Sequence, residues 1–192
     1  MPSPGPANRL RDHAVAAAWG AAEATFLPVV PDVWISRVAL RDPRRALATT
    51  VTATAGAVAG GLLTRAWAAR RPRGRSEDAL VRLPSIDRAM TRGVLDAVRA
   101  KGPGVMLLGP ATGRPYKLYA RAAGVLGMSA GTFAAWSVPA RLPRFLVLAA
   151  VPGALARGAT RRGMRPGTVG ACHAVAWALF YAGYLSTVGR GG

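Results

Sequence analysis

The sequence predicts an all-α integral membrane protein, with two re-entrant helical hairpins and about three to four transmembrane helices. Residues Ala46 to Thr64 and Gly167 to Gly189 contain no Asp, Glu, Lys or Arg. Their lengths match the roughly 20 residues that a helix needs to cross a bilayer. Two further apolar segments are interrupted by proline and glycine. Irregular backbone is tolerated at membrane depth only where protein buries it or where it lines a wet cavity.

The charge balance fits the same interpretation. There are 26 Lys and Arg against 8 Asp and Glu, a net charge of +18, which in a soluble protein would favour nucleic acid. Most arginines fall in the connections between the apolar runs, where they anchor spans at lipid headgroups. We therefore expect membrane lipids with anionic headgroups as partners and no nucleic acid, and leave open a homo-oligomer. The single Cys172 excludes an intramolecular disulfide and a cysteine metal cluster.

The predicted organisation follows the alternation of apolar and polar stretches. It comprises a mobile tail at 1–12 and one domain at 13–189, with a re-entrant segment at 14–36, a span at 46–64, a polar connection with an amphipathic helix at 65–101, a re-entrant segment at 103–128, and spans at 130–153 and 167–189. A broken segment followed by a span occurs twice. Such matching interruptions in two halves are typical of transporters with inverted repeats, whose binding site lies where the breaks meet.

The first broken segment carries two carboxylates. Glu23 and Asp32 flank Pro28 and Pro31, which we expect to form a structural turn. A proline inside a helix removes a backbone hydrogen bond and costs about 3 kcal/mol or more, so two short helices are expected on either side of the turn. An ionisable residue in a membrane segment is a functional candidate because its burial there is costly.

The second broken segment carries cations. Its expected structural turn contains Gly109, Pro110, Gly113 and Pro115, and Arg114 and Lys117 lie in and just after that turn.

Together the two breaks predict a charged central cavity. Glu23 and Asp32 are expected to face the cations of the second break, and the site comprises the substrate- or proton-binding residues Glu23, Asp32, Arg114, Lys117, Arg141 and Arg144. Charge-assisted hydrogen bonds from these cations would hold a phosphate group. That phosphate would compete with the carboxylates, so proton uptake by a carboxylate could accompany headgroup capture. The alternative is that the charges only pair with one another to stabilise the fold.

Three other patterns are expected to serve packing or the membrane interface. Gly56 and Gly60 form a GxxxG pattern, which favours close packing within the chain over a dimer contact. Ser85 is expected to cap an amphipathic helix that lies at the interface or, alternatively, binds a cytosolic partner. An interface belt is predicted for Trp177, Phe180, Tyr181 and Tyr184, and His173 is expected to be packed or hydrogen-bonded.

The first break resembles the DedA family, within the wider class of VTT-domain or SNARE-associated Golgi membrane proteins. Their pattern is approximately E-x-x-F-P-P-x-P-(S/G)-E, and here the same order appears as Glu23-Ala-Thr-Phe-Leu-Pro28-Val-Val-Pro31-Asp32. The spacing between the acids agrees, with Asp in place of the second Glu, one proline absent and Pro31 where a small residue is expected.

The second family signature is a proline and an arginine before a small-residue turn and an Ala-Gly step. It is similar to Gly109-Pro110-Ala-Thr-Gly-Arg114-Pro-Tyr-Lys117, followed by Ala123-Gly124. The arginine spacing differs and extra residues precede the Ala-Gly step, so either Arg114 or Lys117 could fill the cationic role.

The resemblance implies two facing re-entrant hairpins and movement of lipid between leaflets. In bacteria the family's cargo is phospholipid or a polyprenyl-phosphate carrier, with dependence on the proton gradient. If the roles of the family's motif residues apply here, Glu23 and Asp32 are proton-responsive carboxylates, and Arg114 or Lys117 contacts the headgroup. The expected function is a flippase- or scramblase-like lipid transporter of the bacterial inner membrane, with no catalytic residue, cofactor or metal.

Two alternatives from other classes stay open. A structural or assembly membrane protein would use the same charges as internal ion pairs. An enzyme acting on a lipid phosphate would need parts that the sequence lacks, such as a metal-binding carboxylate cluster, a cysteine nucleophile paired with a histidine, or a phosphate-binding loop.

Overall fold

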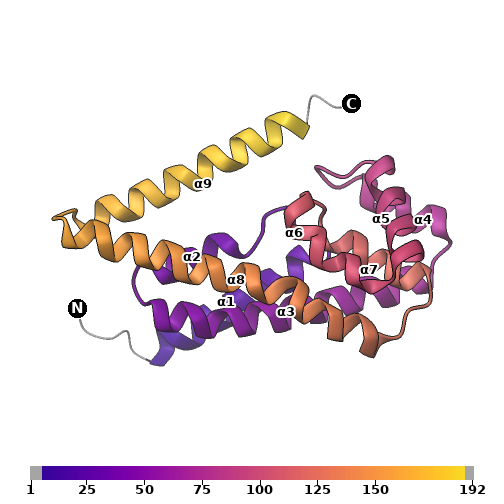
Figure 1. The fold of residues 1–192 in the computed structure, drawn as a ribbon, viewed down its shortest axis with the longest axis horizontal. Coiled ribbons are helices and arrows are strands. Elements are labelled where there is room, and N and C mark those ends of the chain that lie inside the picture. Colours follow the sequence, from indigo (N-terminus) through magenta and orange to yellow (C-terminus); the bar gives the residue numbers. More distant parts are fainter. Residues whose placement is uncertain (1–5, 189–192) are drawn as a thin grey trace.

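The computed structural model describes residues 6–188, and within them the chain is all-α, with nine α-helices and one 3-10 helix (Figure 1). Their bounds are α1 Pro6–Glu23, α2 Asp32–Ala39, α3 Pro43–Ala69, α4 Arg73–Val81, α5 Arg88–Lys101, η1 Pro103–Leu108, α6 Gly109–Thr112, α7 Tyr116–Val125, α8 Ala130–Arg161 and α9 Pro166–Val188. Two of the described helices, α3 and α8, are long and apolar enough to cross a membrane. They contain the spans predicted at 46–64 and 130–153.

The first broken segment forms a helical hairpin. α1 ends at Glu23, the chain turns through residues 24–31, and α2 returns beside the first half of α1 (Figure 1). Two tryptophans join its arms: Trp19 Nε1 donates to the Val29 carbonyl at 2.9 Å, and Trp34 Nε1 donates to the carbonyl of Asp12 at 3.2 Å. The predicted break between Glu23 and Asp32 is therefore confirmed. Its entry into a membrane from one side stays a prediction.

The second broken segment consists of three short helices, η1, α6 and α7. Gly113 ends α6 with a φ of +65°, a left-handed conformation that glycine adopts without steric cost. Pro115 then precedes the first residue of α7. Helices η1 and α6 lie before a glycine- and proline-rich turn and α7 lies after it, so the predicted interruption is present. The relation of the two halves by an inverted repeat stays a prediction.

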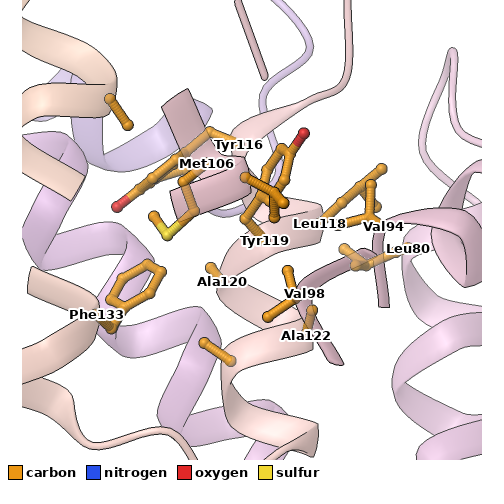
Figure 2. Packing of buried hydrophobic residues seen from close by; sticks show 14 of the residues in the cluster. Leu80, Val94, Val98, Met106, Tyr116, Leu118, Tyr119, Ala120, Ala122 and Phe133 are labelled. Atoms are coloured by element: carbon orange, nitrogen blue, oxygen red, sulfur yellow. The ribbon is translucent and has the colours of Figure 1, made fainter. Parts of the chain in front are cut away.

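The core beside this second break is made mainly by α5, η1, α7 and α8, with Leu80 from α4. Figure 2 shows its apolar side chains, among them Val94 of α5, Met106 of η1 and Phe133 of α8, gathered around α7. Tyr116 belongs to the same cluster, and its ring centroid lies 5.8 Å from that of Phe133. This packing fixes the start of α7, which carries the residues of the second break.

Small residues let α1 and α3 pack with their backbones in contact. A Cβ atom added at Gly56 would lie against the Ala17 carbonyl, and one added at Gly60 would lie against that of Ala21. The expected close packing of the GxxxG pattern within the chain is confirmed. It holds the first hairpin against α3.

Three details differ from the sequence predictions. Helix α1 begins at Pro6, so the predicted tail is wrong for residues 6–12, and residues 1–5 lie outside the described part. The cap of α5 is Asp87, whose Oδ1 accepts from Met90 N at 2.6 Å, and not Ser85. The apolar face of α5 packs into the core through Val94 and Val98, so protein covers the face that was expected to meet lipid or a partner. Residue 189 of the last predicted span also lies outside the described part.

The close contact of α1 and α3 predicts that Gly56→Ala destabilises the protein by about 1–3 kcal/mol, because the new methyl group meets backbone that cannot move aside. The measurement is the free energy of unfolding of the purified protein. Gly158→Ala in α8 is the matched control, since nothing lies within 4 Å of its added Cβ atom. We expect that control to be neutral or stabilising by up to about 1 kcal/mol. Equal effects of the two substitutions would contradict the packing argument.

Candidate functional site

Two buried ion pairs join the first hairpin to α8. Glu23, the last residue of α1, accepts a hydrogen bond from Arg141 Nη2, and both side chains are almost fully buried. Asp32, the first residue of α2, is completely buried and accepts from Arg144 Nε at 2.7 Å. The two arginines lie three residues apart on α8, a spacing that puts them on one face of the helix. Helix α8 therefore binds both ends of the break between α1 and α2.

The backbone makes the two carboxylates unequal. Asp32 lies in the first turn of α2, where the positive end of the helix dipole stabilises a negative charge. Glu23 lies at the last position of α1, where the dipole disfavours it. The dipole thus opposes the charge on Glu23 and favours the charge on Asp32, whereas Asp32 is the more deeply buried of the two.

The expected pairing with the second break is corrected by this arrangement. Lys117 Nζ donates to the Leu27 carbonyl at 2.8 Å, so it binds the turn of the first hairpin and not a carboxylate. The Arg114 side chain makes no hydrogen bond or ion pair within the described residues, and it lines the cavity between the breaks. The reason for the difference is that α8 brings two arginines to the carboxylates with the spacing that the hairpin requires. Arg114 is left as the cation available to a ligand.

Aromatic side chains hold Arg141 in place. Its guanidinium carbon lies 4.8 Å from the ring centroid of Tyr116 and 5.0 Å from that of Phe145. The Tyr116 hydroxyl donates to Ser137 Oγ at 2.6 Å, and Ser137 donates in turn to the Phe133 carbonyl. Cation–π contacts of this kind stabilise a desolvated guanidinium. Arg141 Nε is nevertheless buried without a hydrogen-bond partner.

A cavity of about 420 Å³ lies between the two breaks. Four cations and one carboxylate line it, together with five of the six predicted turn residues: Arg114, Lys117, Arg141, Arg144 and Glu23, with Pro28, Gly109, Pro110, Gly113 and Pro115. The sixth turn residue, Pro31, is buried at the start of α2. Five of the six predicted site residues therefore line this cavity. The sixth, Asp32, is joined to it by its ion pair with Arg144. The cavity's excess of positive charge suits an anion.

A second, larger cleft of about 680 Å³ lies between α8 and α9. Its walls are mostly apolar, with Val147 and Leu148 from α8 and Ala176 and Trp177 from α9. Arg144, Pro110 and Phe180 line both this cleft and the central cavity. The basic central cavity thus adjoins the apolar cleft, and Arg144 lines both.

Neither a family model, nor a curated protein, nor a solved structure matches this chain. The site is therefore interpreted from its own chemistry. Within the described residues, no group of three or more histidine, cysteine, aspartate or glutamate side chains could hold a metal ion.

Helix α9 contributes to the site through residues that were expected to form an interface belt. The Val30 N–H donates to the Tyr181 hydroxyl at 3.0 Å, and Trp177 Nε1 donates to Ser36 Oγ at 3.1 Å. His173 Nε2 lies 2.8 Å from the same Ser36 oxygen, which confirms that this histidine is hydrogen-bonded. Tyr181 and Tyr184 line the central cavity. The sequence held a signal of this role, because the spacing of His173, Trp177, Tyr181 and Tyr184 places all four side chains on one face of a helix.

The buried pair predicts a strong coupling between Glu23 and Arg141. Glu23→Gln and Arg141→Gln are each expected to lose about 3–5 kcal/mol, because either change leaves an uncompensated buried charge. The double variant is expected to lose less than the two combined, with a coupling energy of about 0.5–3 kcal/mol in unfolding experiments. Additive losses would mean that the two side chains do not interact in solution.

Proposed function

We propose that this chain is a membrane lipid transporter of the DedA type, flippase- or scramblase-like, which moves a phospholipid or polyprenyl-phosphate lipid between leaflets. The observation that carries the proposal is the central cavity, which lies between two broken helical segments and is lined by four cations and one carboxylate. Helix breaks that meet at a charged chamber suit transport of a polar group through an apolar protein. An enzyme is not proposed.

The apolar surface supports a location in the membrane. Large apolar side chains on the three longest apolar helices are at least half exposed: Val51 and Leu63 on α3, Val147, Val151 and Leu155 on α8, and Val175, Leu179 and Phe180 on α9. In α8 only 28% of the most apolar stretch is buried inside the protein. A core helix of a soluble protein would bury most of it, whereas lipid covers such a surface in a bilayer. A bacterial inner membrane is part of the proposal.

The ion pairs supply a route by which a headgroup could enter. An anionic phosphate would first meet Arg114, which has no partner of its own within the described residues. It would then compete with Glu23 for Arg141, whose Nε has no acceptor. A proton taken up by Glu23 neutralises the carboxylate and leaves Arg141 free to bind the phosphate. Loss of that proton restores the ion pair and favours release.

The cleft between α8 and α9 gives a place for the hydrocarbon chain. A lipid with its phosphate beside Arg144 could extend its chain past Phe180 and along Leu148 and Ala176. The headgroup would then stay in the basic cavity while the chain stays in apolar surroundings. This division of polar and apolar parts is what a transport path for an amphiphile requires.

A structural or assembly protein is the second candidate, and one observation favours it. Glu23 and Asp32 are both already paired with an arginine, as the internal charges of a scaffold would be. Under that function the pairs contribute only stability. The two candidates differ in what happens when a pair is removed as a unit.

Leaflet exchange tests the transporter directly. We expect wild-type protein in liposomes to exchange a labelled phospholipid or polyprenyl phosphate, with a rate that depends on pH. Glu23→Gln/Arg141→Gln removes both charges of one pair while keeping polar side chains, so it should stay folded and lose at least tenfold in rate. The single variant Glu23→Gln should also lose lipid exchange.

The matched control removes an exposed ion pair, Asp96→Asn/Arg99→Gln, and should exchange lipid normally. If the Glu23→Gln/Arg141→Gln protein is folded and exchanges lipid at the wild-type rate, the mechanism is wrong. If folded wild-type protein moves neither lipid, the scaffold function takes its place.

The chain path predicts that Ala176→Phe, which fills the cleft, slows exchange of long-chain lipids several-fold because the chain loses its space. A short-chain lipid with the same headgroup should be affected less. Ala174→Phe is the control, since Ala174 is exposed on the same helix and does not line the cleft. Equal slowing by both substitutions, or of both lipids, would count against the path.

A further inference from the structure

A second basic site lies at the end of the molecule that carries the N-terminal end of α1, away from the cluster formed by α4 to α7 (Figure 1). It is a crevice of about 140 Å³ between α1, α2 and the start of α3, and it shares no lining residue with the central cavity or the cleft. Its charged lining consists of Arg11, Arg37, Arg41 and Arg45 with Asp12 and Asp42.

Both carboxylates of the crevice already have protein partners. Asp12 forms an ion pair with Arg45 Nη2. Asp42 caps α3, because its Oδ1 accepts a hydrogen bond from the backbone N–H of Arg45 at 3.1 Å. The acids are therefore engaged within the protein, and they do not neutralise the remaining arginines by direct contact.

The other three arginines are without such partners. The side chains of Arg11, Arg37 and Arg41 form no hydrogen bond or ion pair in the described part of the chain, and all three are exposed. Arg45 also retains two buried nitrogens, Nε and Nη1, that have no acceptor. Several guanidinium groups around one small crevice repel one another, and an anion bound between them would offset that repulsion.

Two features of the surrounding structure add to the positive potential and shape of the crevice. Helix α3 starts there, and the positive end of its dipole extends the field of the arginines. Trp34 forms part of the wall, with its indole N–H held by the Asp12 carbonyl at 3.2 Å. Arginine and tryptophan together are typical of the layer where a membrane meets water.

We propose that this crevice binds a phosphate-bearing anion, namely the headgroup of an anionic lipid at the bilayer surface. The planar fork of an arginine matches the oxygens of a phosphate group, and several forks can share one phosphate. The volume suits a headgroup and not a pair of hydrocarbon chains. Exposed Leu47 and Val51 follow Arg45 along α3, so an apolar surface begins next to the crevice. The site is separate from the transport path, and only its lipid source, not its phosphate chemistry, rests on the membrane location proposed above.

The test compares two double variants of the full-length protein that lose the same charge. Arg37→Gln/Arg41→Gln removes two exposed side chains that line the crevice. Arg9→Gln/Arg44→Gln removes two exposed arginines of the neighbouring helices that do not line it. Binding of dioctanoyl phosphatidic acid and of inorganic phosphate is followed by native mass spectrometry of the detergent-solubilised protein, with thermal unfolding as the check that both variants are folded.

We expect the crevice variant to weaken one binding step by about tenfold or more, while the control variant binds as the wild type does. Binding in the central cavity is common to all three proteins and cancels in the comparison. Weakened binding of the lipid alone supports a headgroup site, and weakened binding of both probes supports a site for the phosphate group itself. Equal binding by the crevice variant and the control, or equal loss in both, overturns the proposal in favour of diffuse surface charge. Neither result depends on leaflet exchange, so the outcome is independent of the transport function.

Discussion

The ion pair between Glu23 and Arg141 is the interaction on which the rest of the site depends. It brings a carboxylate at the unfavourable end of one helix against an arginine in the middle of another. Desolvating both charges is costly, so the pair persists only because the surrounding side chains hold it in register. Tyr116 and Phe145 lie near the guanidinium, and Asp32 with Arg144 repeats the arrangement one turn away along α8.

The alignment of Glu23 with Arg141 depends on close backbone contacts between helices at positions far from the charges. The first hairpin lies against α3 through glycine and alanine, and α3 lies in turn against α7 and α8. The turn of the same hairpin accepts a hydrogen bond from Lys117 of α7, and the arginines of α8 pair with the residues at the two ends of that turn. The break in the helices is therefore the point where the two halves of the chain meet. Lys117 and Tyr181 from the second half satisfy two of its backbone groups, and Trp19 from the first half satisfies a third.

Local patterns in the sequence were enough to predict much of this. The prolines and glycines located both breaks, and the two charge-free runs located α3 and α9. The choice of partner could not be predicted, because Arg114, Lys117, Arg141 and Arg144 are all cations near the second break, and only the packing of α8 against the hairpin decides which of them meet Glu23 and Asp32. The role of Tyr181 was missed for a similar reason. An aromatic residue in an apolar helix suggests a membrane interface, whereas its hydroxyl in fact accepts from a backbone amide 151 positions away.

The attachment of α9 has a mechanical consequence. This helix follows a turn in which Gly163 has a φ of +90°, and its hydrogen bonds to the first hairpin come from His173, Trp177 and Tyr181. Each of these bonds ends on the segment from Val30 to Ser36, the same stretch that carries Asp32. A swing of α9 about the glycine would therefore break bonds to the helix interruption while leaving the buried core intact. The central cavity and the cleft, which already share Arg144 and Phe180, would then open into each other.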